Sequence, residues 1–362
     1  MSDDATLTKL VPENDWRALV DPVQLTGWMD AQGLGSGAIE DARILVGGTQ
    51  NLLLQFRRGG RAFVLRRPSR HPRANANDTM LREARLLAAL AATEVRHPRF
   101  IAACADTAVI GTAFFLMDVV DGVNISTGLP ALHAGSAALR RTMGFEMVDA
   151  LLALGEVDPV AVGLADFGKS DGFLQRQVPR WRRQLESYQE LPNWPGAAGL
   201  PEVDAVGRWL EAHVPAQFIP GILHGDFHLA NVMFRHDGAE LAAVIDWEMA
   251  TLGDPLLDLG WLLATWPNPD GTSHGPQAIQ PWQGFPVAEE LIERYAAGSR
   301  RDLSQVHWYA VMACYKLAIV LEGSYARACA GQTSAVIGER LHSSAAGLLR
   351  KAAQWIQAPG AR

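Results

Sequence analysis

Short apolar segments separated by glycine-rich turns mark the first third of the chain. Strands are favoured where such segments alternate with turn residues over so short a distance. Three strands are predicted, at 42–46, 52–57 and 62–67, with turns at 47–51 and 58–60. A further apolar segment, 112–120, is also typical of a strand. The N-terminal region is therefore expected to be rich in β-structure.

Elsewhere the apolar residues recur at the three-to-four-residue spacing of a helix that buries one face. Asp21 followed by Pro22 predicts the start of a helix over 23–32, and Gly33 predicts its end. Further helices are predicted at 78–92, 137–154, 173–188, 203–213 and 306–328, and another is predicted to begin at Pro255 with Asp254 as its cap. Residues 1 to about 20 are expected to be a loosely docked leader. Residues 266–286, rich in Pro, Gly and Gln, are expected to form a long loop of the kind found in lids or disordered segments.

This order of elements predicts an α+β protein with two lobes, 1–120 and 121–362. Its 362 residues are 48% hydrophobic and 20% charged, which is typical of a globular chain. A net charge of −7 argues against a nucleic-acid-binding or anionic-membrane surface. The three scattered cysteines, the absence of a signal sequence and the lack of a long uncharged apolar run favour a cytoplasmic protein.

Candidate chemistry is concentrated in one stretch, His224-Gly225-Asp226-Phe227-His228-Leu229-Ala230-Asn231, which precedes an apolar segment and then Asp246. A carboxylate, a carboxamide and a second carboxylate are the groups that phosphoryl transfer requires, to accept the hydroxyl proton and to hold Mg²⁺. Two alternatives stay open. The triplet at 224–226 is also compatible with an ordinary turn, and His224, Asp226 and His228 would lie on one side of a strand, where they could bind zinc.

The stretch resembles the catalytic loop of the aminoglycoside phosphotransferase family, H-G-D-x-x-x-x-N, and residues 245–247 resemble its I-D-W sequence. The resemblance implies a two-lobed, protein-kinase-like fold with a small β-rich N-lobe that carries one important helix and a larger, mainly helical C-lobe. It also implies ATP and Mg²⁺ as cofactors. Asp226 would be the general base, Asn231 and Asp246 would be metal ligands, and Asp258 would brace the loop.

The same resemblance assigns the N-lobe residues. Arg66 would occupy the place of the usual phosphate-binding lysine, and Glu83 would orient it. Both Arg66 and Arg67 are alternatively exposed charges at a strand end. The turn Gly47-Gly48-Thr49-Gln50-Asn51 would cover the phosphates, and the backbone of Met117-Asp118-Val119-Val120 would meet the adenine.

Residues 246–251, worded Asp-Trp-Glu-Met-Ala-Thr, resemble the phosphotransferase domain associated with acyl-CoA dehydrogenases. That branch implies a small hydroxylated acceptor such as a hydroxyacyl-CoA or a hydroxy acid. Lys316 and Arg327 fall on one stripe of a helix and, with Glu248, are candidate acceptor-binding residues. An antibiotic phosphotransferase and a catalytically silent nucleotide-binding or scaffold module of the same fold are the alternative functions.

Overall fold

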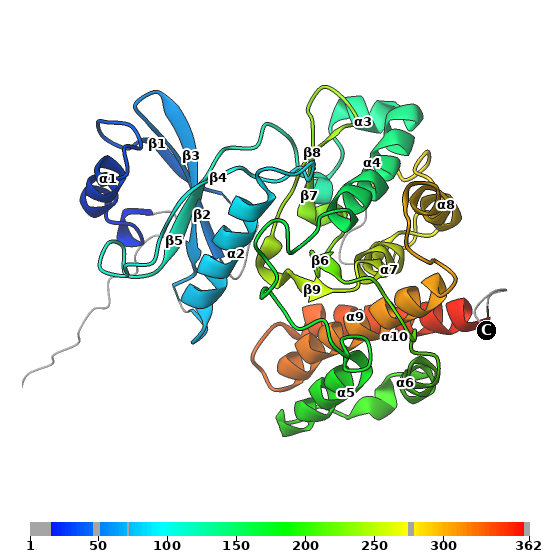
Figure 1. Ribbon diagram of the computed structural model, residues 1–362. Coiled ribbons are helices and arrows are strands. Elements are labelled where there is room, and N and C mark those ends of the chain that lie inside the picture. The colour runs from blue at the N-terminus through cyan, green and yellow to red at the C-terminus, as the bar shows by residue number, and fades with distance from the viewer. Residues whose placement is uncertain (1–15, 46–50, 71, 274–278, 358–362) are drawn as a thin grey trace, which may run out of the picture. The chain divides into compact units, whose positions relative to one another are not determined.

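The computed structural model describes residues 16–45, 51–70, 72–273 and 279–357 (Figure 1). The chain forms two compact units. The first comprises Met1–Ala92 with Pro98–Val120, and the second comprises Thr93–His97 with Asp121–Arg362.

A five-stranded antiparallel sheet is the centre of the first unit. Its strands follow the order β1-β2-β3-β5-β4, with bounds β1 (Glu40–Leu45), β2 (Asn51–Arg58), β3 (Arg61–Pro68), β4 (Phe100–Cys104) and β5 (Phe114–Met117). In the β2–β3 pair Leu54 lies opposite Leu65 and Phe56 opposite Phe63. Residues directly opposite each other share one face of a sheet, so this register gathers their side chains into one core.

Helix α1 (Pro22–Ala31) covers that apolar face. Its start is capped as predicted, because Asp21 Oδ1 accepts the backbone N–H groups of Val23 (2.8 Å) and Gln24 (3.2 Å). The prediction that residues 1 to about 20 form a loosely docked leader is wrong for residues 16–20. Trp16, in the short helix η1 (Trp16–Ala18), and Val20 are buried in the same core. Helix α2 (Ala76–Leu90) packs on β3, β4 and β5.

Two short ribbons organise the second unit around the candidate site. Strand β6 (Gly221–Leu223) pairs with β9 (Thr251–Gly253), and β7 (Val232–Phe234) pairs with β8 (Leu241–Val244). The chain passes between the ribbons twice, through residues 224–231 and through residues 245–250. Both segments that carry the predicted catalytic carboxylates are therefore connections between the same two ribbons.

Helices make up most of the second unit. They are α3 (Ala131–Gly135), α4 (Ala137–Gly155), α5 (Gln177–Ser187), α6 (Val203–Ala212), α7 (Leu256–Thr265), α8 (Ala288–Gly298), α9 (Val306–Cys329) and α10 (Ala335–Gln357). The short helices are η2 (Ile125–Thr127), η3 (Tyr188–Glu190), η4 (Ala197–Gly199), η5 (Leu229–Asn231) and η6 (Trp247–Met249). Helix α9 packs against α5, α6, α7 and α10, as its apolar surface predicts. Figure 1 shows α10 lying along the length of α9.

Within the described residues the segment 266–286 contains neither helix nor strand, so the predicted loop is confirmed there. Trp266, Trp282 and Phe285 are buried and their rings pack on one another, with centroid separations of 4.3 to 5.9 Å. The indole N–H of Trp266 donates to the carbonyl of Pro286 at 2.9 Å. Aromatic packing thus anchors both ends of this segment in the second unit.

The predicted α+β class is confirmed by this division into a β-rich first unit and a helical second unit. All three cysteines are free thiols. Within the described ranges, no helix is both long and apolar enough to cross a membrane.

Candidate active site

A single buried carboxylate holds the start of the β6–β7 connection. Asp258, in the first turn of α7, accepts the backbone N–H of His224 at Oδ2 (2.6 Å) and that of Gly225 at Oδ1 (2.9 Å). Burial raises the pKa of Asp258, and its contacts with His224 and Gly225 offset part of that rise. The bracing predicted for Asp258 is confirmed as two backbone hydrogen bonds.

Gly225 is required by both conformation and space. Its φ is +85°, in the left-handed region that residues with a side chain rarely adopt. A Cβ added there would lie 2.6 Å from the carbonyl oxygen of Met249. Glycine therefore lets the loop turn sharply beside the 245–250 connection and present the next residue, Asp226.

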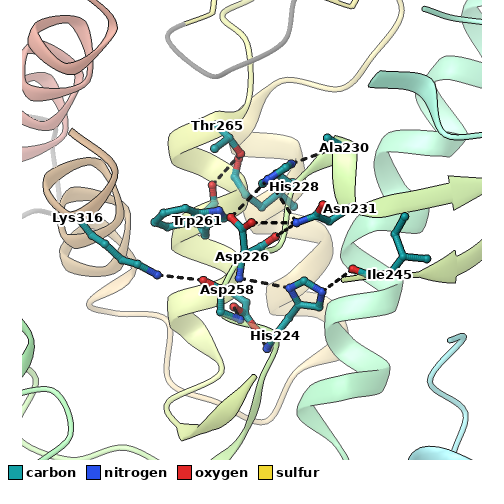
Figure 2. Close-up of polar contacts among 12 residues, drawn as sticks. His224, Asp226, His228, Ala230, Asn231, Ile245, Asp258, Trp261, Thr265 and Lys316 are labelled. Carbon is teal, nitrogen blue, oxygen red and sulfur yellow. Dashed lines mark hydrogen bonds and ion pairs between the residues drawn. The ribbon is translucent and has the colours of Figure 1, made fainter. Parts of the chain in front are cut away.

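Asp226 lies among polar partners of its own loop, with 34% of its side chain exposed (Figure 2). Asn231 Nδ2 donates to the Asp226 carbonyl (2.9 Å) and to its Oδ2 (3.0 Å), and His228 Nε2 lies 3.4 Å from Oδ1. Burial raises the pKa of Asp226, but the hydrogen bond from His228, with the electrostatic effects of His228, His224 and Lys316, outweighs burial and holds that pKa well below its usual range. The carboxylate is ionised at neutral pH and can accept a hydrogen bond from a hydroxyl group.

The two histidines of the loop have defined tautomers. His228 Nδ1 accepts the N–H of Ala230 (3.1 Å), so its Nε2 carries the proton and faces Asp226. His224 Nδ1 accepts the N–H of Asp226 (3.3 Å), and its Nε2 donates to the carbonyl of Ile245 (2.9 Å). Both ring nitrogens of His224 are thus engaged. Among the described residues, no three His, Cys, Asp or Glu side chains group to hold a metal ion, so the zinc arrangement considered from the sequence is wrong.

Asp246 is the second residue after β8, and the residue before it contacts the backbone of Asn231. The N–H of Ile245 donates to the Asn231 carbonyl at 2.9 Å, which fixes the two connections side by side. Asp246 itself has φ +66° and ψ +62°, a left-handed conformation that costs a residue with a side chain about 1–3 kcal/mol. Such strain is concentrated at functional sites, and here it lies at the second predicted carboxylate.

Asn231 and Asp246 are the residues here that could supply oxygen ligands to a cation. Asn231 directs Nδ2 to Asp226, which leaves its Oδ1 as the atom available to a cation. Asp246 adds a carboxylate one residue beyond the hydrogen bond that joins the two connections. Magnesium prefers such oxygen ligands, takes few protein groups and keeps several waters.

Lys316 reaches the loop from the middle of α9. Its Nζ donates to the carbonyl of Gly225 at 3.0 Å, as Figure 2 shows. The same nitrogen lies 4.1 Å from the ring centroid of Trp261 on α7 and 5.6 Å from that of Trp181 on α5. Burial lowers the pKa of Lys316 to about 8, against the opposing charges of Asp226 and Asp258.

In the first unit the structure brings Arg66 and Glu83 together. Arg66 Nε donates to Glu83 Oε2 at 2.9 Å, and both side chains are buried. Arg67 points to the other face of β3, where it donates to the carbonyls of Leu19 and Ile110. Arg66 and Arg67 are therefore not exposed strand-end charges, and strand alternation separates their environments.

Of the predicted phosphate-covering turn, Gly47, Gly48, Thr49 and Gln50 lie outside the described residues. Asn51 is the first residue of β2, opposite Pro68, so the prediction that it belongs to the turn is wrong. Its pairing with β3 extends the strand by one residue.

The predicted adenine-binding segment begins at the last residue of β5, Met117. The backbone N–H of Asp118 donates to the Arg99 carbonyl (2.9 Å), and its carboxylate pairs with Arg61 (2.8 Å). Val119 is exposed and Val120 is half-buried.

The predicted acceptor stripe of α9 does not form one surface. Arg327 is exposed near the end of the helix, where its Nη2 donates to Ser324 Oγ at 3.0 Å. Gly323, between Lys316 and Arg327, packs directly against the hydroxyl of Tyr188. Glu248 is half-buried in η6. Of the two cations on the stripe, Lys316 alone contacts the loop through a hydrogen bond.

Three contributors were not predicted as part of the site, namely the ring of His228 and the indoles of Trp181 and Trp261. The position of His228 within the loop was a signal, since alternate residues there were already considered as a metal set. The two tryptophans lie on separate helices, and no local pattern links them to Lys316.

Comparison with known proteins agrees with this architecture. A family model described as the phosphotransferase enzyme family matches residues 41–309, well over half of the chain. In Rattus norvegicus, acyl-CoA dehydrogenase family member 11 is 30% identical over 296 residues, covering 79% of this chain and 36% of that protein. Acyl-CoA dehydrogenase family member 10 of Mus musculus is 28% identical over 298 residues, covering 81% of this chain and 27% of that protein. The chain thus spans between about a quarter and just over a third of these two relatives.

Solved structures show the same fold. A crystal structure from Ralstonia eutropha JMP134, assigned as an aminoglycoside phosphotransferase, superposes with a TM-score of 0.76 at 27% identity, covering 92% of this chain and 98% of that one. A thermostable mutant of aminoglycoside phosphotransferase APH(4)-Ia, in a ternary complex with ADP and hygromycin B, has a TM-score of 0.57 at 15% identity and covers 92% and 98% of the two chains. Because the family model matches well over half of it, the chain belongs to the phosphotransferase enzyme family.

Proposed function

We propose that this protein is an ATP- and Mg²⁺-dependent kinase that transfers the γ-phosphoryl group of ATP to a hydroxyl group of a small acceptor. The observation that carries the proposal is the ionised, partly exposed carboxylate of Asp226, held by its own loop beside Asn231 and the Asp246 connection. These are the groups that in-line phosphoryl transfer uses for positioning and charge compensation.

In the proposed reaction, Asp226 accepts the hydrogen bond of the acceptor hydroxyl and takes its proton. The hydroxyl oxygen forms a bond to the γ-phosphorus, and the bond from that phosphorus to the β–γ bridging oxygen breaks, so ADP leaves with the electron pair. His228 Nε2–H and Asn231 Nδ2 each lie at one oxygen of the Asp226 carboxylate and restrict its rotation. A fixed carboxylate orients the hydroxyl at little entropic cost.

The metal ligands in this proposal are Asn231 Oδ1 and the Asp246 carboxylate. Bound there, Mg²⁺ would neutralise the charge of the phosphate oxygens. The left-handed backbone of Asp246 directs the chain away from β8 immediately after the pairing with Asn231. This is the support for placing the second ligand at the end of that strand.

Nucleotide binding is proposed for the first unit. Arg66 would hold the α- and β-phosphates, and its ion pair with Glu83 would fix the guanidinium. Residues Gly47 to Gln50 would cover the phosphates, and the backbone at Met117–Val120 would meet the adenine. The buried Arg66–Glu83 pair supports this assignment, because a buried charge pair needs a reason to be kept where apolar packing would serve equally well.

The acceptor is proposed to be a hydroxyacyl-CoA or a related hydroxy acid. The relatives in rat and mouse carry acyl-CoA dehydrogenase in their names, and this chain is similar to a portion of each. Arg180 on α5, which acts on the buried Lys316, adds a positive charge near the loop that suits a carboxylate or phosphate group of the acceptor.

The test is ADP formation by the full chain with Mg²⁺·ATP and a panel of hydroxyacyl-CoAs, free hydroxy acids and aminoglycosides, with the phosphorylated product identified by mass spectrometry. Asp226→Asn should lower kcat by about 10²-fold or more and leave ATP affinity unchanged. Asp121→Asn, at an exposed carboxylate, is the matched control.

The other possible results distinguish the alternative functions. Turnover of aminoglycosides and not of acyl substrates would identify an antibiotic phosphotransferase. ATP binding without transfer to any acceptor would identify the silent module. Full activity in Asp226→Asn would remove that residue from the role of base.

A further inference from the structure

Lys316 joins α9 to the residue immediately before the proposed base. Its Nζ donates to the Gly225 carbonyl at 3.0 Å, and that carbonyl belongs to the peptide whose N–H is on Asp226. On the other side of Gly225, the backbone N–H is held by Asp258 Oδ1 at 2.9 Å. Gly225 is thus held at both its N–H and its C=O, from α7 and from α9.

Two indole rings flank the Lys316 ammonium. The ring of Trp261 lies at 4.1 Å and that of Trp181 at 5.6 Å, so the cation is stabilised by ring faces. Both indole N–H groups are buried and, within the described part of the chain, make no hydrogen bond. The charged groups that act on Lys316 are Asp226 in the loop, Asp258 on α7 and Arg180 on α5.

We propose that Lys316 is a positioning residue for phosphoryl transfer, whose protonated side chain clamps the Gly225–Asp226 peptide and so fixes the direction of the Asp226 carboxylate. This inference rests on the proposed kinase function and adds a residue that lies 91 positions from the catalytic loop. It also assigns the ammonium a role within the protein, in place of the acceptor contact expected from the sequence.

The cost of burying this charge supports a functional reason for it. Burial lowers the pKa of Lys316 to about 8 from 10.5. Between pH 8 and 10.5 the unfolded chain keeps the Lys316 proton, whereas the folded chain has lost it. The contribution of Lys316 to stability therefore increases as the pH rises from 8 to 10.5. At neutral pH the charged side chain therefore opposes folding, and a stabilising role does not account for it.

The same titration gives the reaction a distinctive pH dependence. Above pH 8 the folded protein loses the Lys316 charge, the bond to the Gly225 carbonyl weakens, and the rate of transfer should fall. Lys316→Arg keeps a positive charge to much higher pH, so its alkaline limb should move upward. Lys316→Met keeps the aliphatic stem but not the clamp, and its kcat should fall by about 10²-fold with no limb near pH 8.

The experiment compares wild type, Lys316→Met, Lys316→Arg and the exposed control Lys169→Met for kcat and KM between pH 6 and about 10, with Mg²⁺·ATP and the best acceptor of the panel, or water as acceptor. A wild-type profile in Lys316→Met, when Asp226→Asn is inactive, would overturn the clamp and leave the kinase assignment standing. If Lys316→Met does not fold, a limb that stays near pH 8 in Lys316→Arg overturns the clamp.

A second readout does not depend on activity. The chain has four lysines, Lys9, Lys169, Lys316 and Lys351, so the ε-carbon signal of Lys316 can be assigned by its loss in Lys316→Met. NMR titration should show it titrating near 8, and its neutralisation should shift the backbone amide signal of Asp226. An Asp226 signal that does not respond when Lys316 is neutralised contradicts the clamp even if wild type transfers no phosphoryl group and the proposed function fails.

Discussion

Asp258 and Gly225 are 33 positions apart in the chain, yet the Asp258 carboxylate accepts the Gly225 N–H at 2.9 Å while its other oxygen accepts the N–H of His224 at 2.6 Å. One buried side chain thereby fixes two consecutive peptides at the point where the loop turns. The orientation of the proposed base thus depends on a residue of α7, outside the loop itself.

Asp258→Ala should therefore reduce both stability and activity. The substitution leaves the buried N–H groups of His224 and Gly225 without acceptors, at about 1–3 kcal/mol each. We expect a lower urea midpoint and a kcat reduced by at least tenfold, with an unchanged KM for ATP. Asp204→Ala, at an exposed carboxylate in the first turn of α6, is the control. Wild-type stability would show that water or another group replaces the brace.

Arg66→Ala should weaken nucleotide binding. The charge-assisted contacts of a guanidinium contribute about 1.5–3 kcal/mol, so the KM for ATP should rise about tenfold or more. Arg67→Ala should instead lower the melting temperature and leave that KM unchanged, because Arg67 donates to backbone carbonyls on the opposite face of β3. Steady-state kinetics and thermal denaturation separate the two. The reverse pattern would mean that Arg67 is the phosphate ligand.

Much of the fold could be predicted because local patterns decide it. Alternation and turn residues give β2 and β3 nearly at their observed bounds, and Asp21 with Pro22 gives the start of α1. Strand β4 (Phe100–Cys104) contains small residues at its centre and gives no apolar alternation. Helix α5 begins at Gln177, four residues later than predicted, because 173–176 form turns. Helix α10 is absent from the sequence-based predictions.

The candidate site divides in the same way. Asp226, Asn231 and Asp246 could be chosen as candidates from their spacing along the sequence, because they lie on two short connections between the same ribbons. The Lys316 contact with Gly225 could not be predicted, since it depends on how α9 packs. Helical periodicity places Lys316 and Arg327 on one stripe, but eleven residues of helix separate them by about 16 Å along the axis. Tyr188 covers the stripe between them.

Asp246→Ala should abolish the Mg²⁺ dependence of turnover. Without this carboxylate, phosphate charge is left uncompensated, so kcat should fall by about 10²-fold or more and added Mg²⁺ should not restore it. Isothermal titration of Mg²⁺·ATP measures the loss directly. Asp237→Ala, at a carboxylate that is 72% exposed, is the control. Normal Mg²⁺-dependent turnover in Asp246→Ala would assign the second ligand elsewhere.

Lys351 provides a prediction about stability that is independent of catalysis. Its Nζ donates to the carbonyls of Leu263 (2.8 Å), Ala264 (3.1 Å) and Trp266 (2.9 Å), the groups that the C-terminal end of α7 leaves without helical partners. A cation there also interacts favourably with the helix dipole.

Lys351→Met keeps the aliphatic stem but leaves these buried carbonyls without a donor, so we expect the free energy of unfolding to fall by about 2–4 kcal/mol. Urea denaturation measures the change, with the exposed neighbour Arg350→Met as the matched control. Because α7 also carries Asp258, kcat should begin to fall at a lower temperature in Lys351→Met than in wild type, while its value at low temperature is unchanged. Equal stability of Lys351→Met and Arg350→Met would show that water replaces Lys351 as the hydrogen-bond donor at the end of α7.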